Sequence, residues 1–271
     1  MTDEPGPPPQ VPAEALGQPP LTPEPAAGKA PIPMAAPERE PFWGYLDLLI
    51  FVGLAIPCML VGFGVVKAVH WALRLHAPAS TWELLADQLV GYGFLFSMLA
   101  ALFRTQYDWP FWRSLGWTAS RLPAFSIAAY GIMLAMGLGI LGKLIHIPTV
   151  ENPLTKLLKD PASVMLIAVF GTLIAPVCEE LIFRGFLQPL LVRSIGAFAG
   201  VLAAALPFGL LHYQEYGNSW RHVLLITLSG VAFGWMRQTT GSTRAAAGLH
   251  ASFNGFQFVA LIAAKGLGPY N

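Results

Sequence analysis

Polar and ionisable residues gather in three short clusters within otherwise apolar stretches of this 271-residue chain: Glu179–Arg184, Phe208–His212 and His250–Asn254. An uncompensated ionisable group near the centre of a bilayer costs roughly 2.5–3.5 kcal/mol. These groups are therefore expected to face a protein-lined cavity and to find partners there. Two glutamates, two histidines and an asparagine suit hydrolysis, because a carboxylate and an imidazole can activate water while an amide stabilises an oxyanion.

The first cluster holds two adjacent glutamates that stand in different positions relative to an arginine. On a helix, Glu180 and Arg184 lie four residues apart and can form an ion pair. Glu179 lies about 100° away around the helix and escapes that pair. The paired glutamate is then held ionised, whereas the unpaired one lies in a drier cavity and suits the role of general base. The alternative is a salt-bridged cluster that only locks two helices together.

The other two clusters each place a pair of side chains on one helix face. Phe208 and His212 lie four residues apart, as do His250 and Asn254. An imidazole and an amide one turn apart can both stabilise a developing oxyanion. Taken singly, His212 suits a structural role at a helix end, and the other pair suits an interhelical clamp. Because three segments each bury polar groups at the expense of insertion energy, we expect one shared site.

The composition predicts an integral, multi-pass membrane protein. The chain is 55% hydrophobic and only 11% charged, its mean hydropathy is +0.55, and soluble domains carry about 25% charged residues. A net charge of +1 gives no indication of nucleic-acid binding. Cys58 and Cys178 both lie in apolar segments, which argues against a disulfide framework. Nothing near Cys178 would stabilise a thiolate nucleophile.

The order of segments predicts an all-α, polytopic transmembrane bundle of about seven to eight helices. Residues 1–41 contain more than half of the 24 prolines and are expected to be disordered. A helical domain is expected over 42–271, with the motifs in a core of about 160–260. Apolar runs near the ~20 residues needed to cross a bilayer follow one another, at 44–72, 84–104, 122–145, 162–193, 195–213, 219–237 and 243–265.

The fourth run must form one long helix if Glu179 and His212 are to lie at the same depth. A helix over 162–193 would be roughly 48 Å long, against a hydrocarbon core of ~30 Å, and Pro176 is expected to kink it. The Trp- and Arg-rich segment 105–120 is predicted to lie at the membrane interface. Arginines expected on one side favour a cytoplasmic N-terminus: Arg104, Arg113, Arg121, Arg193, Arg237 and Arg244.

The three clusters resemble, in order, the EExxxR, FxxxH and HxxxN motifs of the CPBP family, the type II CAAX prenyl endopeptidases and their bacterial relatives. The resemblance covers about residues 160–260 and implies a glutamate-dependent intramembrane endopeptidase. By motif position, Glu179 and His212 would activate a water molecule, and His250 and Asn254 would form the oxyanion site. Glu180, Arg184 and Phe208 would support these four side chains. No cofactor and no metal is implied.

The implied substrate is a membrane-associated or lipidated protein or peptide, including prenylated ones, and the implied location is the bacterial inner membrane. The substrate's identity, the cleavage site, the oligomeric state and the sidedness of the site stay open. A zinc protease that uses Glu179, His212 and His250 as ligands is one alternative, although the sequence has no HExxH motif. A non-catalytic immunity or binding protein that retains the motifs is the other. An ion-coupled transporter is disfavoured, because no internal repeat is found.

Overall fold

A computed structural model describes residues 2, 6, 40–73, 81–150 and 160–265. The chain divides into two units, Met1–Pro37 and Glu38–Asn271, and the second unit holds every described helix. The predicted disorder of residues 1–41 falls almost wholly outside the described residues. Pro41 is buried, and its carbonyl accepts a hydrogen bond from Arg193 Nη1, so the ordered part of the second unit includes this position.

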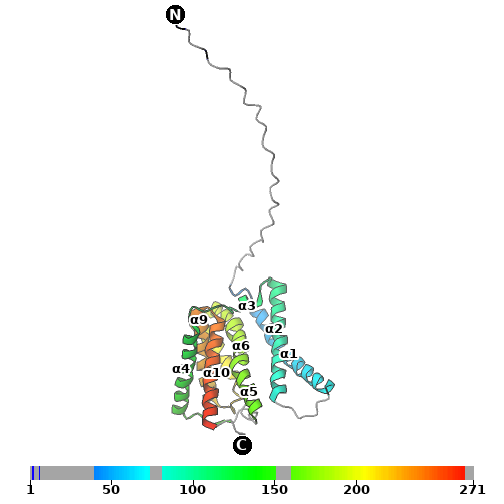
Figure 1. Ribbon diagram of the computed structural model, residues 1–271, viewed down its shortest axis with the longest axis vertical. Helices are drawn as coiled ribbons and strands as arrows, with labels where there is room; N and C mark the ends of the chain where they lie inside the picture. The colour runs from blue at the N-terminus through cyan, green and yellow to red at the C-terminus, as the bar shows by residue number, and fades with distance from the viewer. Residues whose placement is uncertain (1, 3–5, 7–39, 74–80, 151–159, 266–271) are drawn as a thin grey trace. The chain divides into compact units, whose positions relative to one another are not determined.

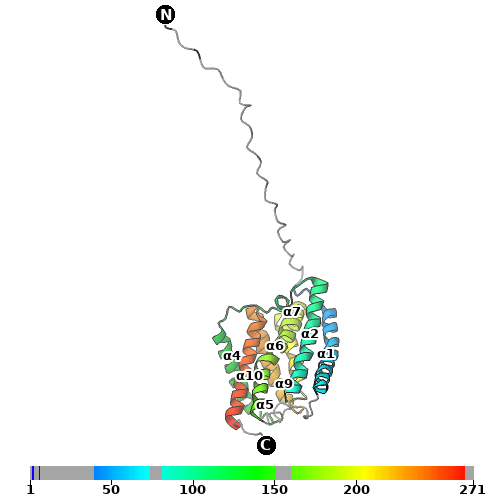
Figure 2. The same ribbon diagram turned by 45° about the vertical axis from the view of Figure 1, so that its right-hand side comes forward.

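The described residues form helices and no strands, which confirms the predicted all-α class (Figures 1 and 2). The 35 residues from 161 to 195 form one continuous helical segment with both α and π turns. The elements in chain order are α1 (Tyr45–Ala72), α2 (Thr81–Tyr107), α3 (Phe111–Ser114), α4 (Ala124–Leu144), α5 (Pro161–Val169), η3 (Phe170–Ile174), α6 (Ala175–Glu180), η4 (Leu181–Leu187), α7 (Gln188–Ile195), α8 (Ala197–Leu211), α9 (Trp220–Thr240) and α10 (Thr243–Lys265).

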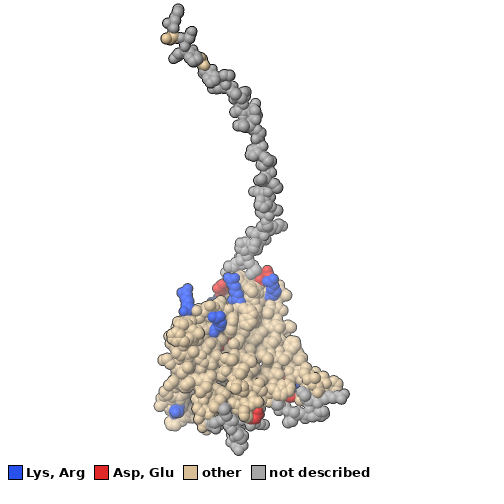
Figure 3. Space-filling model, viewed as in Figure 1, with Lys and Arg blue, Asp and Glu red and all other residues tan. Residues whose placement is uncertain are grey.

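Five helical segments are long and apolar enough to cross a membrane: Tyr45–Ala72, Thr81–Tyr107, Ala124–Leu144, Pro161–Ile195 and Thr243–Ala264. The predicted multi-pass membrane protein is thereby confirmed. The predicted spans 195–213 and 219–237 are not among these five. Helix α8 is apolar but only 15 residues long, and α9 is not apolar enough to be included. On the face shown in Figure 3, charged side chains lie towards the two ends, with a wide uncharged band between them.

The segment 161–195 is continuous, as the common depth of the motifs requires. Asp160 begins it by accepting hydrogen bonds from the Ala162 and Ser163 amides, each at 3.0 Å, and Pro161 occupies the first turn, where its missing N–H is not needed. Hydrogen bonds from Ser163 hold the pKa of the Asp160 carboxyl below its ordinary value. Gly196, with φ of +85°, ends the helix in a conformation that favours glycine.

The disturbance predicted at Pro176 takes the form of a π-helical turn. The Ala175 amide donates to the carbonyl of Phe170, five residues back. With the same five-residue spacing, residue 176 would donate its amide hydrogen to the Gly171 carbonyl, but Pro176 has no N–H to donate. A second π segment, η4, directly follows Glu180. Such π turns are often found at functional sites, and here they flank the two glutamates.

The three motif-bearing segments pack against one another. Helix α10 contacts α4, α9, α6 and η3, and α8 packs mainly on α7 and α9. Phenylalanines from the three motifs and from α9 form a common apolar core: Phe183, Phe208, Phe233 and Phe253. This core brings the clusters at 179–184, 208–212 and 250–254 together inside the bundle.

The Trp- and Arg-rich segment between α2 and α4 is anchored to the start of α10. Thr243 Oγ1 donates to the Leu115 carbonyl at 2.6 Å, and Ser242 Oγ donates to the Thr118 carbonyl at 2.6 Å. The Leu115 side chain is fully buried. The segment therefore helps to fix α10 and is more than an interfacial connection.

Close packing of α1 on α2 depends on a glycine at the crossing point, which generates a prediction. A Cβ added at Gly62 would lie 2.7 Å from the Gly91 amide nitrogen and 2.8 Å from the Asp87 carbonyl oxygen, whereas one at Gly64 would meet nothing within 4 Å. Gly62→Ala must separate two backbones and should lower stability by about 1–3 kcal/mol. Gly64→Ala, the matched control, should be neutral or slightly stabilising, because alanine favours helix.

Thermal unfolding of both purified variants in the same detergent checks this prediction. Equal melting temperatures for Gly62→Ala and Gly64→Ala would show that the two helices do not approach as described.

Candidate active site

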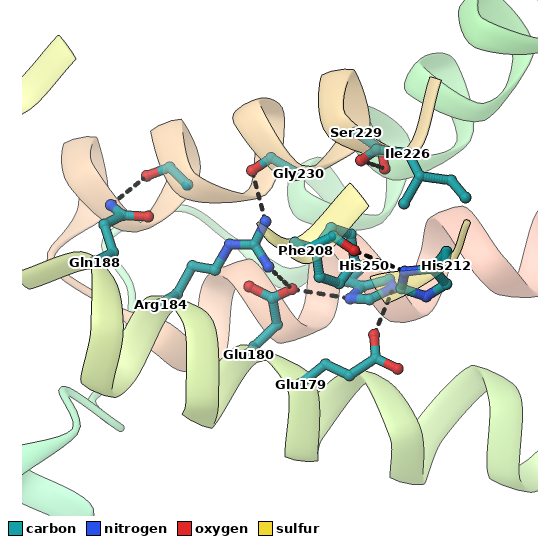
Figure 4. Close-up of polar contacts among 11 residues, drawn as sticks. Glu179, Glu180, Arg184, Gln188, Phe208, His212, Ile226, Ser229, Gly230 and His250 are labelled. Atoms are coloured by element: carbon teal, nitrogen blue, oxygen red, sulfur yellow. Dashed lines mark hydrogen bonds and ion pairs between the residues drawn. The ribbon is translucent and has the colours of Figure 1, made fainter. Parts of the chain in front are cut away.

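A buried carboxylate, Glu180, lies at the centre of the candidate site (Figure 4). Its Oε1 atom is 2.9 Å from Arg184 Nη1 and also 2.9 Å from His250 Nδ1. Glu180 and Arg184 are fully buried, and His250 is 4% exposed. The predicted ion pair at four-residue spacing is present, and the third motif joins it through an imidazole. Among the described residues, no hydrogen bond or ion pair within 4 Å joins Arg184 to Glu179.

Arg184 is held by three kinds of partner. Its Nη1 donates to Glu180, and its Nη2 donates to the Gly230 carbonyl on α9 at 2.6 Å. The guanidinium also lies over the ring of Phe208, 4.6 Å from its centroid, and 5.4 Å from that of Phe233. Aromatic faces attract a desolvated cation. The arginine is therefore compensated on several sides although water does not reach it.

The hydrogen-bond partner of His250 determines what its second nitrogen can do. An ionised carboxylate only accepts hydrogen bonds, so Nδ1 of His250 donates to Glu180. In the neutral ring, Nε2 is then the unprotonated nitrogen. Nε2 lies 3.8 Å from Glu179 Oε2, which is too long for a direct hydrogen bond. The ring is stacked on Phe233 with centroids 4.3 Å apart, so its plane is fixed.

His212 has the same tautomer for a different reason. Its Nδ1 lies 2.8 Å from the Phe208 carbonyl oxygen, and a carbonyl can only accept. The proton is therefore on Nδ1, and Nε2 is left unprotonated. His212 ends α8 as its C-cap residue. Phe208 contacts both imidazoles, with ring centroids 5.1 Å from His212 and 5.8 Å from His250.

Asn254, which was predicted to help form the oxyanion site, uses one of its amide hydrogens for a contact with the backbone. Its Nδ2 donates to the Gly171 carbonyl at 2.9 Å. This is the carbonyl that Pro176 leaves without a donor in the π register, so Asn254 compensates for the proline. A carboxamide carries two hydrogens, and the contact with Gly171 uses one of them.

Two residues near the site were missed by the sequence analysis. Glu215 follows His212 by three residues in the turn before α9; burial raises the pKa of its carboxyl above the ordinary value, and His212 partly opposes that rise. Gln188 follows Arg184 by four residues and is 2% exposed. Its position on the same helix face as Glu180 and Arg184 was the available signal for Gln188.

Within the described ranges, no group of three or more His, Cys, Asp or Glu side chains is arranged to hold a metal ion. The three ligands of the zinc alternative are therefore not gathered as a metal centre there. Both cysteines are buried and free, in agreement with the prediction of no disulfide framework.

Paired carboxylates and imidazoles thus lie together within a helical membrane bundle. Residues 161–256 match the family described as type II CAAX prenyl endopeptidase, Rce1-like, and all three motifs lie inside the match. This match confirms the resemblance recognised from the motifs over this segment. No curated protein and no solved structure matches the chain.

The pairing of Glu180 with Arg184 generates a stability prediction. Arg184→Met removes the cation and leaves a buried carboxylate whose one remaining hydrogen-bond partner is His250, which should cost about 3–5 kcal/mol. Glu180→Gln/Arg184→Met removes both charges and should recover a large part of that loss. Denaturant or thermal unfolding in detergent of the two variants provides the comparison. A double variant less stable than Arg184→Met would contradict the pairing.

Proposed function

We propose that the protein is an intramembrane endopeptidase in which Glu179 activates a water molecule that hydrolyses a peptide bond of a membrane-associated or lipidated protein or peptide. The family match supports protease activity of the CAAX type. The observation that carries the proposal is the position of Glu179. It is the carboxylate outside the ion pair, its side chain is 22% exposed, and it lies 3.8 Å from the unprotonated nitrogen of His250.

In the proposed reaction, the Glu179 carboxylate takes a proton from water as the oxygen attacks the scissile carbonyl carbon. The unprotonated Nε2 of His212 accepts a hydrogen bond from the same water and orients it. Phe208 supports this role, because it contacts the His212 ring and supplies the carbonyl that fixes its tautomer. Exclusion of bulk water by the surrounding helices strengthens these interactions.

The proposed oxyanion site consists of His250 and the second amide hydrogen of Asn254. Nε2 of His250 becomes a donor when it receives, from Glu179 Oε2 at 3.8 Å, the proton that was taken from water, and the carboxylate of Glu180 stabilises the resulting imidazolium. When the tetrahedral intermediate collapses, the C–N bond breaks and this proton passes to the leaving nitrogen. Glu180 thus orients His250 and compensates its charge, while Arg184 holds the Glu180 carboxylate in place. Asn254, whose amide is held by the Gly171 carbonyl, is a donor before the reaction begins, and donors fixed in advance stabilise a developing oxyanion more than mobile ones do.

A non-catalytic immunity or binding protein is the competing function. A purely structural network needs Glu180, Arg184 and His250, which bond to one another and, through Arg184, to the Gly230 carbonyl. Such a network does not need Glu179. Among the described residues this carboxylate makes no hydrogen bond, and the nearest basic atom is His250 Nε2 at 3.8 Å. This carboxylate, which lies outside the Glu180–Arg184 ion pair, favours the hydrolase.

The different roles proposed for Glu179 and Glu180 provide the test of the proposed function. In proteoliposomes with a fluorogenic, lipid-anchored peptide, Glu179→Gln should abolish turnover while the melting temperature stays near that of the parent protein. Glu180→Gln should lower turnover and stability together, because it breaks contacts with Arg184 and His250.

The same assay on chelator-washed protein serves as the control for the zinc alternative, with elemental analysis of the active sample. We expect full activity and no stoichiometric zinc. Equal losses of stability and turnover in both glutamine variants would contradict the separate roles. Unchanged turnover in Glu179→Gln would refute the proposed base.

A further inference from the structure

Three polar side chains lie at four-residue intervals along the segment 161–195. Glu180 and Arg184 are fully buried, and Gln188 is 2% exposed. The π turns of η4 separate the first from the third. The proposed reaction uses Glu180 and Arg184 but assigns nothing to Gln188, although burying a carboxamide without a purpose is costly.

Arg184 and Gln188 both donate to backbone carbonyls of α9. Arg184 Nη2 donates to Gly230 at 2.6 Å, and Gln188 Nε2 donates to Gly234 at 2.9 Å. The two donors are four residues apart, and so are the two acceptors. The hydrogen bonds therefore form a ladder with two rungs between the segment 161–195 and α9 (Figure 4).

The ladder exists only because both acceptors are glycines. A Cβ added at Gly230 would lie 3.0 Å from Phe208 Cδ1 and 3.1 Å from Arg184 Nη2. A Cβ added at Gly234 would lie 2.7 Å from Gln188 Oε1 and 2.9 Å from Val201 Cγ1. The GxxxG pair, common in membrane helix contacts, here lets two long polar side chains reach the α9 backbone.

The hydrogen bond from Gln188 to Gly234 holds the one from Arg184 to Gly230 in place. Arg184 must reach Gly230 with one nitrogen and Glu180 with the other, so a small slide of α9 along the segment would break one of these two bonds. Gln188, one turn further on, opposes such a slide because its own bond to Gly234 would break with it. The position of Glu180 relative to His250 then follows from the position of Arg184.

We propose that Gln188 is a positioning residue of the active site, acting through Arg184 and Glu180 on the orientation of His250. The inference rests on the proposed function for its effect on turnover, but its effect on His250 can be measured without any substrate. The competing explanation is an ordinary interhelical hydrogen bond that contributes stability alone.

The test uses Gln188→Met, which keeps the length of an unbranched side chain and removes the donor. Ser194→Ala is the matched control, since Ser194 Oγ donates to the Leu190 carbonyl at 2.9 Å and accepts from the Tyr45 hydroxyl on α1 at 2.7 Å, but makes no described contact with α9. Both proteins are labelled with ¹⁵N-histidine, and the His250 ring signals are assigned by comparison with His250→Gln.

In the parent protein and in Ser194→Ala, we expect His250 to be protonated at Nδ1 and not at Nε2. In Gln188→Met, the two ring nitrogen signals should move towards a mixture of tautomers. Turnover should fall about tenfold, the size expected for one lost hydrogen bond, with KM changed by less than about twofold. Parental His250 signals in a folded Gln188→Met protein would overturn the proposal, whatever the change in melting temperature.

Gly234→Ala provides a second route if Gln188→Met does not fold. Its methyl group displaces Gln188 Oε1, so it should shift the His250 signals in the same direction. The double variant Gln188→Met/Gly234→Ala should be no worse than Gln188→Met alone, because the two changes break one contact. If the effects of Gln188→Met and Gly234→Ala on turnover and on the His250 signals simply add in the double variant, the two residues do not share one contact and the proposal is wrong. If the parent protein cleaves no peptide but the His250 signals still shift, the positioning role stands and the proposed function fails.

Discussion

The need to compensate one buried carboxylate organises the centre of this protein. Glu180 is fully buried, and its single oxygen Oε1 binds both Arg184 and His250. In an apolar interior neither the carboxylate nor the guanidinium is tolerated alone, so the two must be brought together on the same helix. Two other features of the site depend on this pair: the aromatic rings pack beside Arg184, and the tautomer of His250 is set by its bond to Glu180.

Local backbone irregularities make this arrangement possible. Pro176 leaves the Gly171 carbonyl without a donor, and Asn254 supplies one from α10. Gly230 and Gly234 allow polar side chains to reach the backbone of α9. These features would weaken an ordinary transmembrane helix. Here they are compensated by side chains of the other motif-bearing helices, so the motifs and the backbone defects form one structural unit.

The sequence predicted what depends on periodicity and spacing, and missed what depends on contacts between distant helices. The ion pair of Glu180 and Arg184 followed from four-residue spacing, and the long helix over 161–195 followed from the need for a common depth. The hydrogen bond from His250 to Glu180 joins residues 70 positions apart, and the spacing of residues within one helix cannot predict such a contact. Asn254 was predicted to help form the oxyanion site, and its hydrogen bond to the Gly171 carbonyl was not foreseen, because the carbonyl freed by Pro176 can be recognised only once the π register is known. The span expected over 195–213 was too long because the turn after His212 ends α8 early.

The central claim, that Glu179 activates water and does not itself attack the substrate, is tested most directly by isotope transfer. The purified protein hydrolyses a lipid-anchored peptide in ¹⁸O-labelled water through many turnovers, and both the products and the enzyme are analysed by mass spectrometry. The account predicts ¹⁸O in the new C-terminal carboxylate of the product and none in the enzyme peptide that contains Glu179. Label in Glu179 would reveal a covalent intermediate and contradict the account, as would the absence of any cleavage by the folded protein.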